Sequence, residues 1–208
     1  MDGPARRSPV RFEAEALRTV VRDDWTIVLE YAEQGDGPHL VDLSHLPRWD
    51  VQHTRLDEAD LGNLAVPVQP GASFLRARIL VNRMNRAQAS VWHLHGEPVA
   101  LPASEAFTDV TDATVFLGLV GAGALRVAER LSNLDFGQPD RAPPFLLQGP
   151  FSHVPCQIAV MGTSGAGAGL LLTCARGYAR DLVAAILHAG APEGLRPAGE
   201  SSIARWLG

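Results

Sequence analysis

Short runs of alternating apolar and polar residues fill the first half of the chain, and this pattern is typical of half-buried β-strands. The runs lie at residues 20–31, 39–51, 73–81 and 87–95. Pro47 interrupts the second run, and residues 82–86 connect the last two. Residues 57–64 begin with acidic side chains and end before Pro67, which predicts one or two turns of helix. The first half therefore predicts the order strand, short helix, strand, strand.

The second half mixes apolar strand-like runs with segments in which apolar residues recur every three or four positions, as they do in an amphipathic helix. The predicted strands are residues 109–119, 151–161 and 169–175, and the predicted helices are residues 124–134, 178–189 and 201–207. Residues 162–169 are rich in glycine, contain no lysine and join two predicted strands. They therefore predict a flexible hairpin tip rather than a phosphate-binding loop, which would lead into a helix.

The two halves repeat a similar order of elements, and a local echo relates Val41-Asp42-Leu43-Ser44 to Thr108-Asp109-Val110-Thr111. These features predict an α+β fold of two related strand-helix-strand-strand modules, with mixed or antiparallel sheets that share a sheet or a core. We place a loosely held arm at residues 1–12, the first module at residues 13–103 and the second module at residues 104–208, all in one compact folding unit. The proline-containing segment 96–104 is the predicted boundary.

All 18 basic residues are arginine, which excludes enzymes that need a lysine for a Schiff base, a pyridoxal-phosphate aldimine or a phosphate loop. The 23 acidic residues give a net charge of −5, so neither a nucleic acid nor an anionic membrane is favoured as a partner. The longest apolar run, residues 113–125, is too short to span a bilayer, and the N-terminus lacks the apolar stretch of a signal peptide. We expect a cytoplasmic protein.

His93 and His95 are two residues apart in a predicted strand, which places both imidazoles on one face, with Glu97 nearby. This spacing occurs in metal sites, but no further ligand is evident elsewhere in the chain. The pattern therefore favours a strand end with polar tips, and we assign no metal ligand.

Three other polar pairs have structural interpretations that outweigh catalytic ones. Asp109 and Asp112 could act as paired carboxylates, but a turn cap at the start of a strand explains them as well. Ser44-His45 and Ser152-His153 are adjacent in sequence, and neighbours in a strand face opposite sides, so neither forms a nucleophile–base dyad alone.

Cys156 and Cys174 lie at almost equal distances from the glycine-rich segment, so hairpin pairing would bring them close together. We interpret them as small buried apolar residues in a reducing compartment, with a redox pair as the alternative. Residues 176–180 place two arginines where a strand leads into a helix, which hints at an anionic partner.

Three segments resemble the glycine-cleavage T protein superfamily, the folate-binding aminomethyltransferases. They are residues 40–46 (LVDLSHL), residues 116–121 (FLGLVG) with the helix that follows, and the tail from residues 176–180 (RGYAR) to residues 194–200 (GLRPAGE). The length is similar to that of the γ subunit of heterotetrameric sarcosine oxidase, a truncated form of that domain without the C-terminal barrel. The resemblance covers most of residues 14–207.

This resemblance implies a small accessory subunit without catalytic residues. In the sarcosine oxidase family the larger subunits hold FAD, FMN, NAD and tetrahydrofolate, and they oxidatively demethylate an N-methyl amine such as sarcosine. Active aminomethyltransferases carry an acidic residue on the strand comparable with residues 87–95 and a glutamate in the turn comparable with residues 177–180, and this chain has neither. We therefore expect no cofactor in this chain and a buried interface with larger flavin-binding subunits.

The alternative implied by the same resemblance is a stand-alone one-carbon transferase that binds tetrahydrofolate in the cleft between the two modules, where ligands often bind. The candidate contacts are Arg83, Asn85, Trp92, Tyr178 and Arg196.

Overall fold

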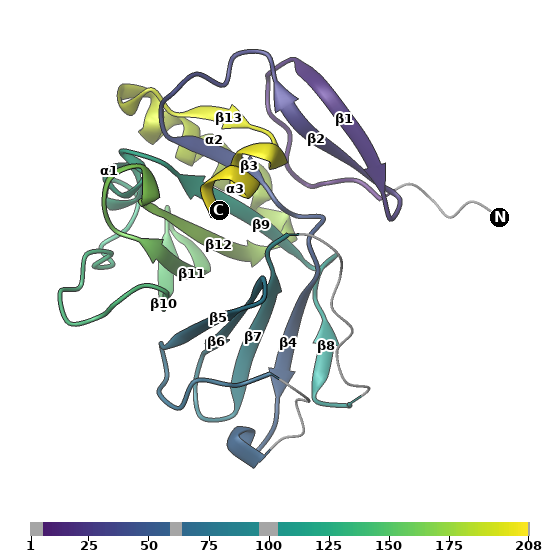
Figure 1. Ribbon diagram of the computed structural model, residues 1–208, viewed down its shortest axis with the longest axis vertical. Helices are drawn as coiled ribbons and strands as arrows, with labels where there is room; N and C mark the ends of the chain where they lie inside the picture. The colour runs from purple at the N-terminus through teal and green to yellow at the C-terminus, as the bar shows by residue number, and fades with distance from the viewer. Residues whose placement is uncertain (1–5, 59–63, 96–103, 208) are drawn as a thin grey trace.

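Two packed β-sheets form the centre of the computed structural model, which describes residues 6–58, 64–95 and 104–207 (Figure 1). The six-stranded sheet has the order β10 (Phe145–Phe151), β11 (Val154–Gly162), β12 (Gly169–Ala175), β9 (Thr114–Val120), β3 (His39–Asp42) and β13 (Arg196–Ala198). The five-stranded sheet has the order β5 (Ser73–Arg76), β6 (Ile79–Arg83), β7 (Gln88–His93), β4 (Arg48–Gln52) and β8 (Phe107–Asp109). A separate hairpin pairs β1 (Ala16–Arg22) with β2 (Trp25–Tyr31).

Helices cover the six-stranded sheet on both faces. The helices are α1 (Ala124–Glu129), α2 (Ala179–Gly190) and α3 (Glu200–Leu207), and short 3-10 turns occur at Leu56–Glu58, Gly165–Gly167, Arg176–Tyr178 and Ala191–Glu193. Val127 of α1 and Ile186 of α2 share one core cluster with Leu117 of β9 and Leu172 of β12. These side chains alternate along their strands with those that face the other way, as the pleat of a sheet requires. None of the helices among the described residues has the length and hydropathy needed to cross a lipid bilayer.

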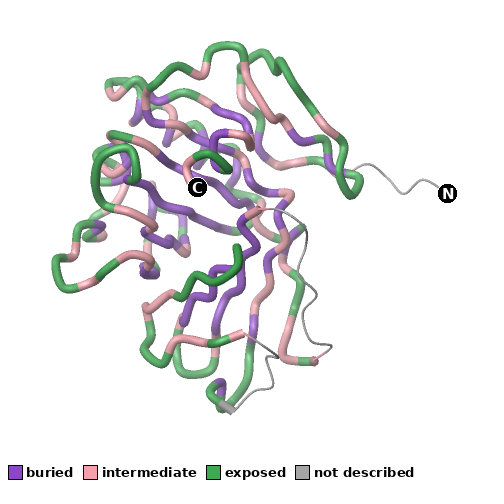
Figure 2. The backbone as a smooth tube through the Cα atoms, in the orientation of Figure 1, coloured by how far each residue is buried: buried purple, intermediate pink, exposed green. Residues whose placement is uncertain are grey.

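A second core cluster joins the two sheets on the opposite face. Phe116 of β9 and Leu171 of β12 pack there with Leu80 of β6 and Trp92 of β7, and Ile203 of α3 closes the cluster. Figure 2 shows this arrangement as buried backbone that runs through the strands of both sheets, while β1 lies on the exposed side of its hairpin. The two sheets therefore share a core, as the sequence predicts.

The α+β class is confirmed, with antiparallel pairing in both large sheets and one parallel pair between β13 and β3. The predicted strand 20–31 is wrong as a single element, because β1 and β2 form a hairpin about Asp23 and Asp24. The predicted strand 73–81 is likewise two strands, β5 and β6, with Ala77 and Arg78 at the turn.

Other boundaries also differ from the sequence-based expectation. The predicted strand 109–119 divides into β8 and β9, the predicted helix 124–134 ends at Glu129, and β10 was not predicted at all. The predicted helix at residues 57–64 is a 3-10 turn at Leu56–Glu58, and residues 59–63 lie outside the described residues. The glycine-rich segment does join β11 to β12, so the predicted hairpin tip is confirmed.

The hairpin turns explain these missed boundaries. Asp23-Asp24, Ala77-Arg78 and Ser152-His153 all have positive φ at both residues. Such two-residue turns usually contain glycine or asparagine, because other side chains are strained at positive φ. None of the three pairs contains glycine or asparagine, so the sequence lacks the strongest signal of such a turn there.

Replacing Arg78 by glycine should raise the free energy of unfolding by about 0.5–1 kcal/mol, because glycine adopts the φ of 72° at this turn without strain. The same change should raise the pKa of His95, since burial and then the charge of Arg78 both lower it. Urea denaturation and an NMR titration of His95 test the two effects. Arg76→Gly, in the extended strand of the same hairpin, should instead lower stability.

The sheets exchange strands between the two halves of the chain. β3 comes from the first half but lies beside β9, whereas β8 comes after residue 103 but lies beside β4. The chain therefore crosses between the sheets twice, at residues 43–47 and at residues 110–113. The module boundary at residues 103/104 stays a prediction, and most of the segment 96–104 lies outside the described residues.

Candidate functional site

The two crossings between the sheets are held by matching hydrogen bonds. At the first crossing the carboxylate of Asp42 accepts the N–H of Ser44 at 3.0 Å, and at the second the carboxylate of Asp109 accepts the N–H of Thr111 at 2.8 Å. The hydroxyl oxygen of Ser44 accepts the N–H of Phe116, and that of Thr111 accepts the N–H of Arg48. At each crossing the aspartate therefore caps the local turn. The hydroxyl group of the same crossing binds the strand that follows the other crossing.

These matching hydrogen bonds explain the sequence similarity between residues 41–44 and 108–111. Two backbone bonds repeat the same pattern, because Leu43 N–H donates to Phe116 and Val110 N–H donates to Arg48. The prediction that Asp109 or Asp112 caps a turn is confirmed at Asp109, and Asp112 forms an exposed ion pair with Arg6 instead of pairing with Asp109. Ser44 and His45 do not form a dyad, since Ser44 is buried against Phe116 N–H in the core and the His45 ring pairs with Glu200.

Arg48 lies buried between the crossings and ties them together. Its guanidinium donates to the carbonyl oxygens of Ser44, Leu46, Thr111 and Thr114 and to the hydroxyl of Thr114. It also lies 5.1 Å from the centroid of the Phe116 ring. Burial lowers the pKa of Arg48 to about 10, and the charges of Asp42 and Asp109 oppose that shift. The group therefore stays charged at neutral pH and acts as a structural clamp.

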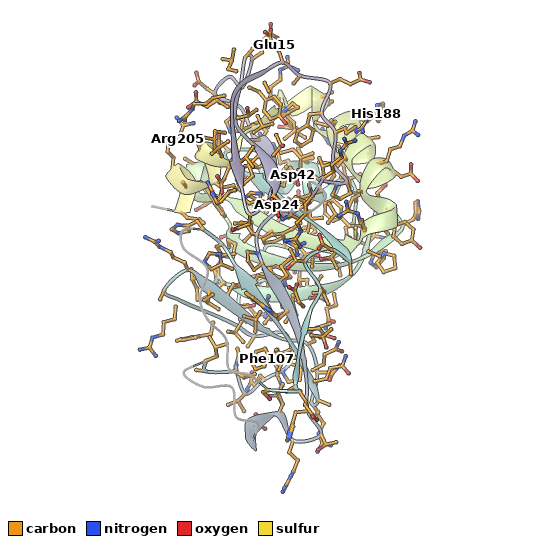
Figure 3. All side chains as sticks on the ribbon, turned by 90° about the vertical axis from the view of Figure 1, so that its right-hand side faces the viewer. Glu15, Asp24, Asp42, Phe107, His188 and Arg205 are labelled. Atoms are coloured by element: carbon orange, nitrogen blue, oxygen red, sulfur yellow. The ribbon has the colours of Figure 1, made fainter. Side chains whose placement is uncertain are left out.

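A polar cleft of about 90 Å³ opens between the β1–β2 hairpin and the six-stranded sheet. Its polar lining includes Tyr31, Asp42 and His45, and Trp25 and Ala198 contribute apolar surface. Burial and the nearby charge of Asp42 raise the pKa of Tyr31 to about 12, so its hydroxyl stays protonated. Figure 3 shows Asp42 in the part of the molecule built by the six-stranded sheet, away from Phe107 of the five-stranded sheet. The cleft can hold a small polar molecule or several waters.

His45 anchors α3 at one side of this cleft. Its Nε2 lies 2.9 Å from Oε1 of Glu200, the first residue of α3, and Arg22 donates to both oxygens of the same carboxylate. The Glu200 side chain is only 13% exposed. Burial alone would raise its pKa, but the hydrogen bonds from His45 and Arg22 outweigh burial and hold the pKa at about 2. A carboxylate in the first turn also interacts favourably with the helix dipole.

The stability that Glu200 contributes should depend on pH. Because its pKa is lower in the folded protein than in the unfolded chain, the contribution is complete above pH about 4.5 and is lost as the pH falls through about 2. Glu200→Gln should therefore cost about 2–3 kcal/mol at pH 6, and the difference from wild type should shrink below pH about 4. Urea denaturation at both pH values measures it.

A matched control is Glu30→Gln, which removes only the exposed ion pair with Arg18. This control should change stability by less than about 0.5 kcal/mol. A Glu200→Gln difference that does not change with pH would contradict the assignment.

The five candidate folate contacts lie in different parts of the fold, except for Arg83 and Asn85, which are two residues apart. Arg83, at the end of β6, is buried; it donates to Asp57 and to the backbone of Asn85, the second candidate. Trp92 of β7 packs edge-on against Phe116 in the shared core and is 1% exposed. Tyr178 precedes α2 and is largely exposed, and Arg196 is exposed on β13. The structure thus brings Arg83 and Asn85 together, and the polar cleft contains none of the five.

The histidine and cysteine pairs can also be placed. His93 of β7 is buried, whereas His95 is partly exposed, and Glu97 lies outside the described residues. In the part of the chain that the structure describes, no group of three or more His, Cys, Asp or Glu residues is arranged to hold a metal ion. Cys156 and Cys174 are free buried thiols that hydrogen-bond to each other, so the predicted proximity is confirmed.

Sequence reasoning missed Arg48, Tyr31 and Glu200. An arginine after Leu46-Pro47 gives no signal of burial, because arginine is nearly always exposed. Glu200 precedes an amphipathic segment, and an acidic residue at a helix start is a common surface feature. The partner of Arg48 at Thr111 lies 63 residues away in sequence, and the partner of Glu200 at His45 lies 155 residues away, so local patterns do not reveal them.

Solved structures share this fold, although no protein-family model and no curated protein matches the sequence. A chain of the heterotetrameric sarcosine oxidase from Corynebacterium sp. U-96, in complex with pyrrole 2-carboxylate, superposes with a TM-score of 0.58 at 11% identity, over 74% of this chain and 83% of that chain. The glycine cleavage system aminomethyltransferase T from Bartonella henselae superposes with a TM-score of 0.62 at 17% identity, over 96% of this chain and 61% of that chain. The chain has an aminomethyltransferase-like fold and spans less than two thirds of the length of the second protein.

Proposed function

We propose that this chain is a small accessory subunit, of the γ type, in a heteromeric sarcosine-oxidase-like complex that oxidatively demethylates an N-methyl amine. The observation that carries the proposal is the match to a chain of a heterotetrameric sarcosine oxidase, of which 83% is covered. The match to the aminomethyltransferase covers only 61% of that longer protein. This chain therefore covers a larger share of the oxidase chain than of the complete transferase.

The polar groups of the site support a structural role. Ser44, Arg48 and Thr111 are buried and bind the two crossings, and the ionised Glu200 carboxylate is held by Arg22 and His45. A catalytic acid, base or nucleophile needs a reactive atom that a substrate can reach. These groups instead hold the sheets and α3 in place, as a scaffolding subunit requires.

Exposed apolar side chains on two strands at sheet edges suggest where larger subunits bind. Leu17 and Val21 project from β1, where Val21 is 71% exposed, and Phe74 and Leu75 project from β5, where Phe74 is 43% exposed. Apolar side chains on an open strand edge favour association with another chain. FAD, FMN, NAD and tetrahydrofolate would then be bound by those partners.

Affinity purification of the tagged full chain from its own cells tests this proposal. We expect larger subunits to co-purify in fixed proportion, with flavin absorbance and oxidation of an N-methyl amine. Val21→Glu and Phe74→Glu should each weaken recovery of the complex, whereas Val68→Glu, at an exposed loop position, serves as the matched control. A monomer that recruits no flavoprotein would contradict the proposal.

The second candidate function is a stand-alone tetrahydrofolate-dependent transferase, and the aminomethyltransferase match over 96% of this chain favours it. Calorimetry of the purified chain with tetrahydrofolate separates the two functions. Binding tighter than the millimolar range, weakened by Tyr178→Ala or Arg196→Ala, would support the transferase. The accessory-subunit proposal expects no such binding.

A further inference from the structure

Cys156 and Cys174 face each other across two neighbouring strands of the six-stranded sheet. The antiparallel ladder ends at Gln157 of β11 opposite Thr173 of β12, and continuing its register places Cys156 opposite Cys174. The two thiols are hydrogen-bonded to each other. Residues directly opposite in an antiparallel pair have Cβ atoms about 4.5–5.5 Å apart, and a disulfide needs about 3.5–4.5 Å. A small local shift is therefore enough to link the two sulfur atoms.

The ladder beside the cysteine pair lacks one pair of N–H donors. Pro150 of β10 lies opposite Pro155 of β11, immediately beside the cysteine pair. Proline has no N–H, so neither residue of this pair donates to the ladder. Gly149 lies opposite Cys156, and the Leu134 side chain packs against it. The backbone next to Cys156 therefore has fewer hydrogen-bond donors than a regular ladder.

A small reagent can approach the pair from solvent. A cleft of about 400 Å³ is lined by both cysteines, together with Gln148 and Gly149 of β10, Pro155 of β11 and Ala113. Both cysteines are buried, but they border this opening. The cleft has the size needed to admit part of a thiol-containing peptide.

The two thiols are not equivalent. The hydrogen bond from Cys156 lowers the pKa of Cys174, although burial opposes that shift. The same hydrogen bond and burial raise the pKa of Cys156. Since a thiolate is the attacking species in thiol–disulfide exchange, Cys174 is the nucleophile and Cys156 is the resolving thiol.

We propose that Cys156 and Cys174 are a reactive dithiol that small-molecule disulfides convert into an intrachain disulfide. The Cys174 thiolate attacks one sulfur of the small disulfide, the S–S bond breaks, and one thiolate leaves and takes up a proton. The mixed disulfide at Cys174 carries no negative charge, so Cys156 loses a proton more easily and attacks the sulfur of Cys174. A second small thiol leaves. One small disulfide is reduced to two thiols while the two cysteines are oxidised to one disulfide.

Treatment of the reduced full chain with oxidised glutathione tests this proposal. We expect the native protein to lose both alkylatable thiols together, to lose two hydrogens in mass, and to release a peptide containing a Cys156–Cys174 link on digestion without reductant. Dithiothreitol should restore both thiols. Two free thiols after treatment, stable glutathione adducts on both cysteines, or links between chains would overturn the proposal.

A single variant and the wild-type chain test the order of attack. Cys156→Ser should accumulate a stable glutathione adduct on Cys174, because the resolving thiol is missing. Cys174→Ser removes the main cause of the raised pKa of Cys156, so the order of attack is measured in the wild-type chain. Mass spectrometry of quenched samples should show the first adduct at Cys174 at least about tenfold more often than at Cys156. Equal rates of adduct formation at the two cysteines of the wild-type chain would overturn the assignment of roles.

Discussion

Replacing Arg48 by methionine is expected to lower the free energy of unfolding by about 3–5 kcal/mol, because a charged group removed from a buried network leaves its partners unpaired. The guanidinium donates to four carbonyl oxygens at the two crossings between the sheets. Methionine has a similar length but no donor, so these oxygens would be buried without that bond. Urea denaturation followed by circular dichroism measures the loss.

Two variants make the Arg48 result specific. Arg48→Lys keeps the charge but lacks the planar fork, so it should recover only part of the stability. Arg18→Met removes an exposed arginine that pairs with Glu30, and it should change stability by less than about 0.5 kcal/mol. If Arg48→Met cost less than about 1 kcal/mol, the crossings would be held by their own turns and Arg48 would not be the clamp.

The sequence predicted the local part of the fold and missed the long-range part. The glycine-rich hairpin tip was predictable because glycine marks a turn by itself, and the closeness of Cys156 and Cys174 follows from that hairpin. The hairpin at Ala77-Arg78 gives no such mark, because its positive φ angles are imposed by the pairing of β5 with β6. Tertiary pairing overrides local preference there.

The exchange of β3 and β8 between the sheets was also beyond local patterns. Alternation identifies a strand and its buried face, but it does not say which of two sheets the strand joins. The echo between residues 41–44 and 108–111 was visible, yet its meaning depends on hydrogen bonds that Phe116 N–H donates to Ser44 and Arg48 N–H donates to Thr111. Partners more than 60 residues apart cannot be assigned from one sequence, so the site was predicted only as isolated polar pairs.

Replacing Trp92 by alanine is expected to lower the free energy of unfolding by about 3–5 kcal/mol, the usual loss for a large buried aromatic side chain. Trp92 lies between the two sheets, with its ring centroid 5.2 Å from that of Phe116 in an edge-on arrangement. It belongs to the core cluster that contains Leu80 of one sheet and Leu171 of the other. Removing the indole leaves a cavity in the core cluster that both sheets share, so unfolding should stay cooperative but begin at lower urea concentration.

This prediction separates a core role for Trp92 from a folate-contact role. A contact residue in an open cleft would lose ligand affinity with little change in stability, whereas a core residue loses stability first. Trp49→Ala is the matched control, because Trp49 lies on β4 of the same sheet but is only partly buried; its cost should be clearly smaller. A double-mutant cycle with Phe116→Leu should give a coupling of about 0.5–1.5 kcal/mol from the edge-on contact. If Trp92→Ala left stability unchanged and abolished tetrahydrofolate binding, that result would contradict the accessory-subunit proposal and support the transferase.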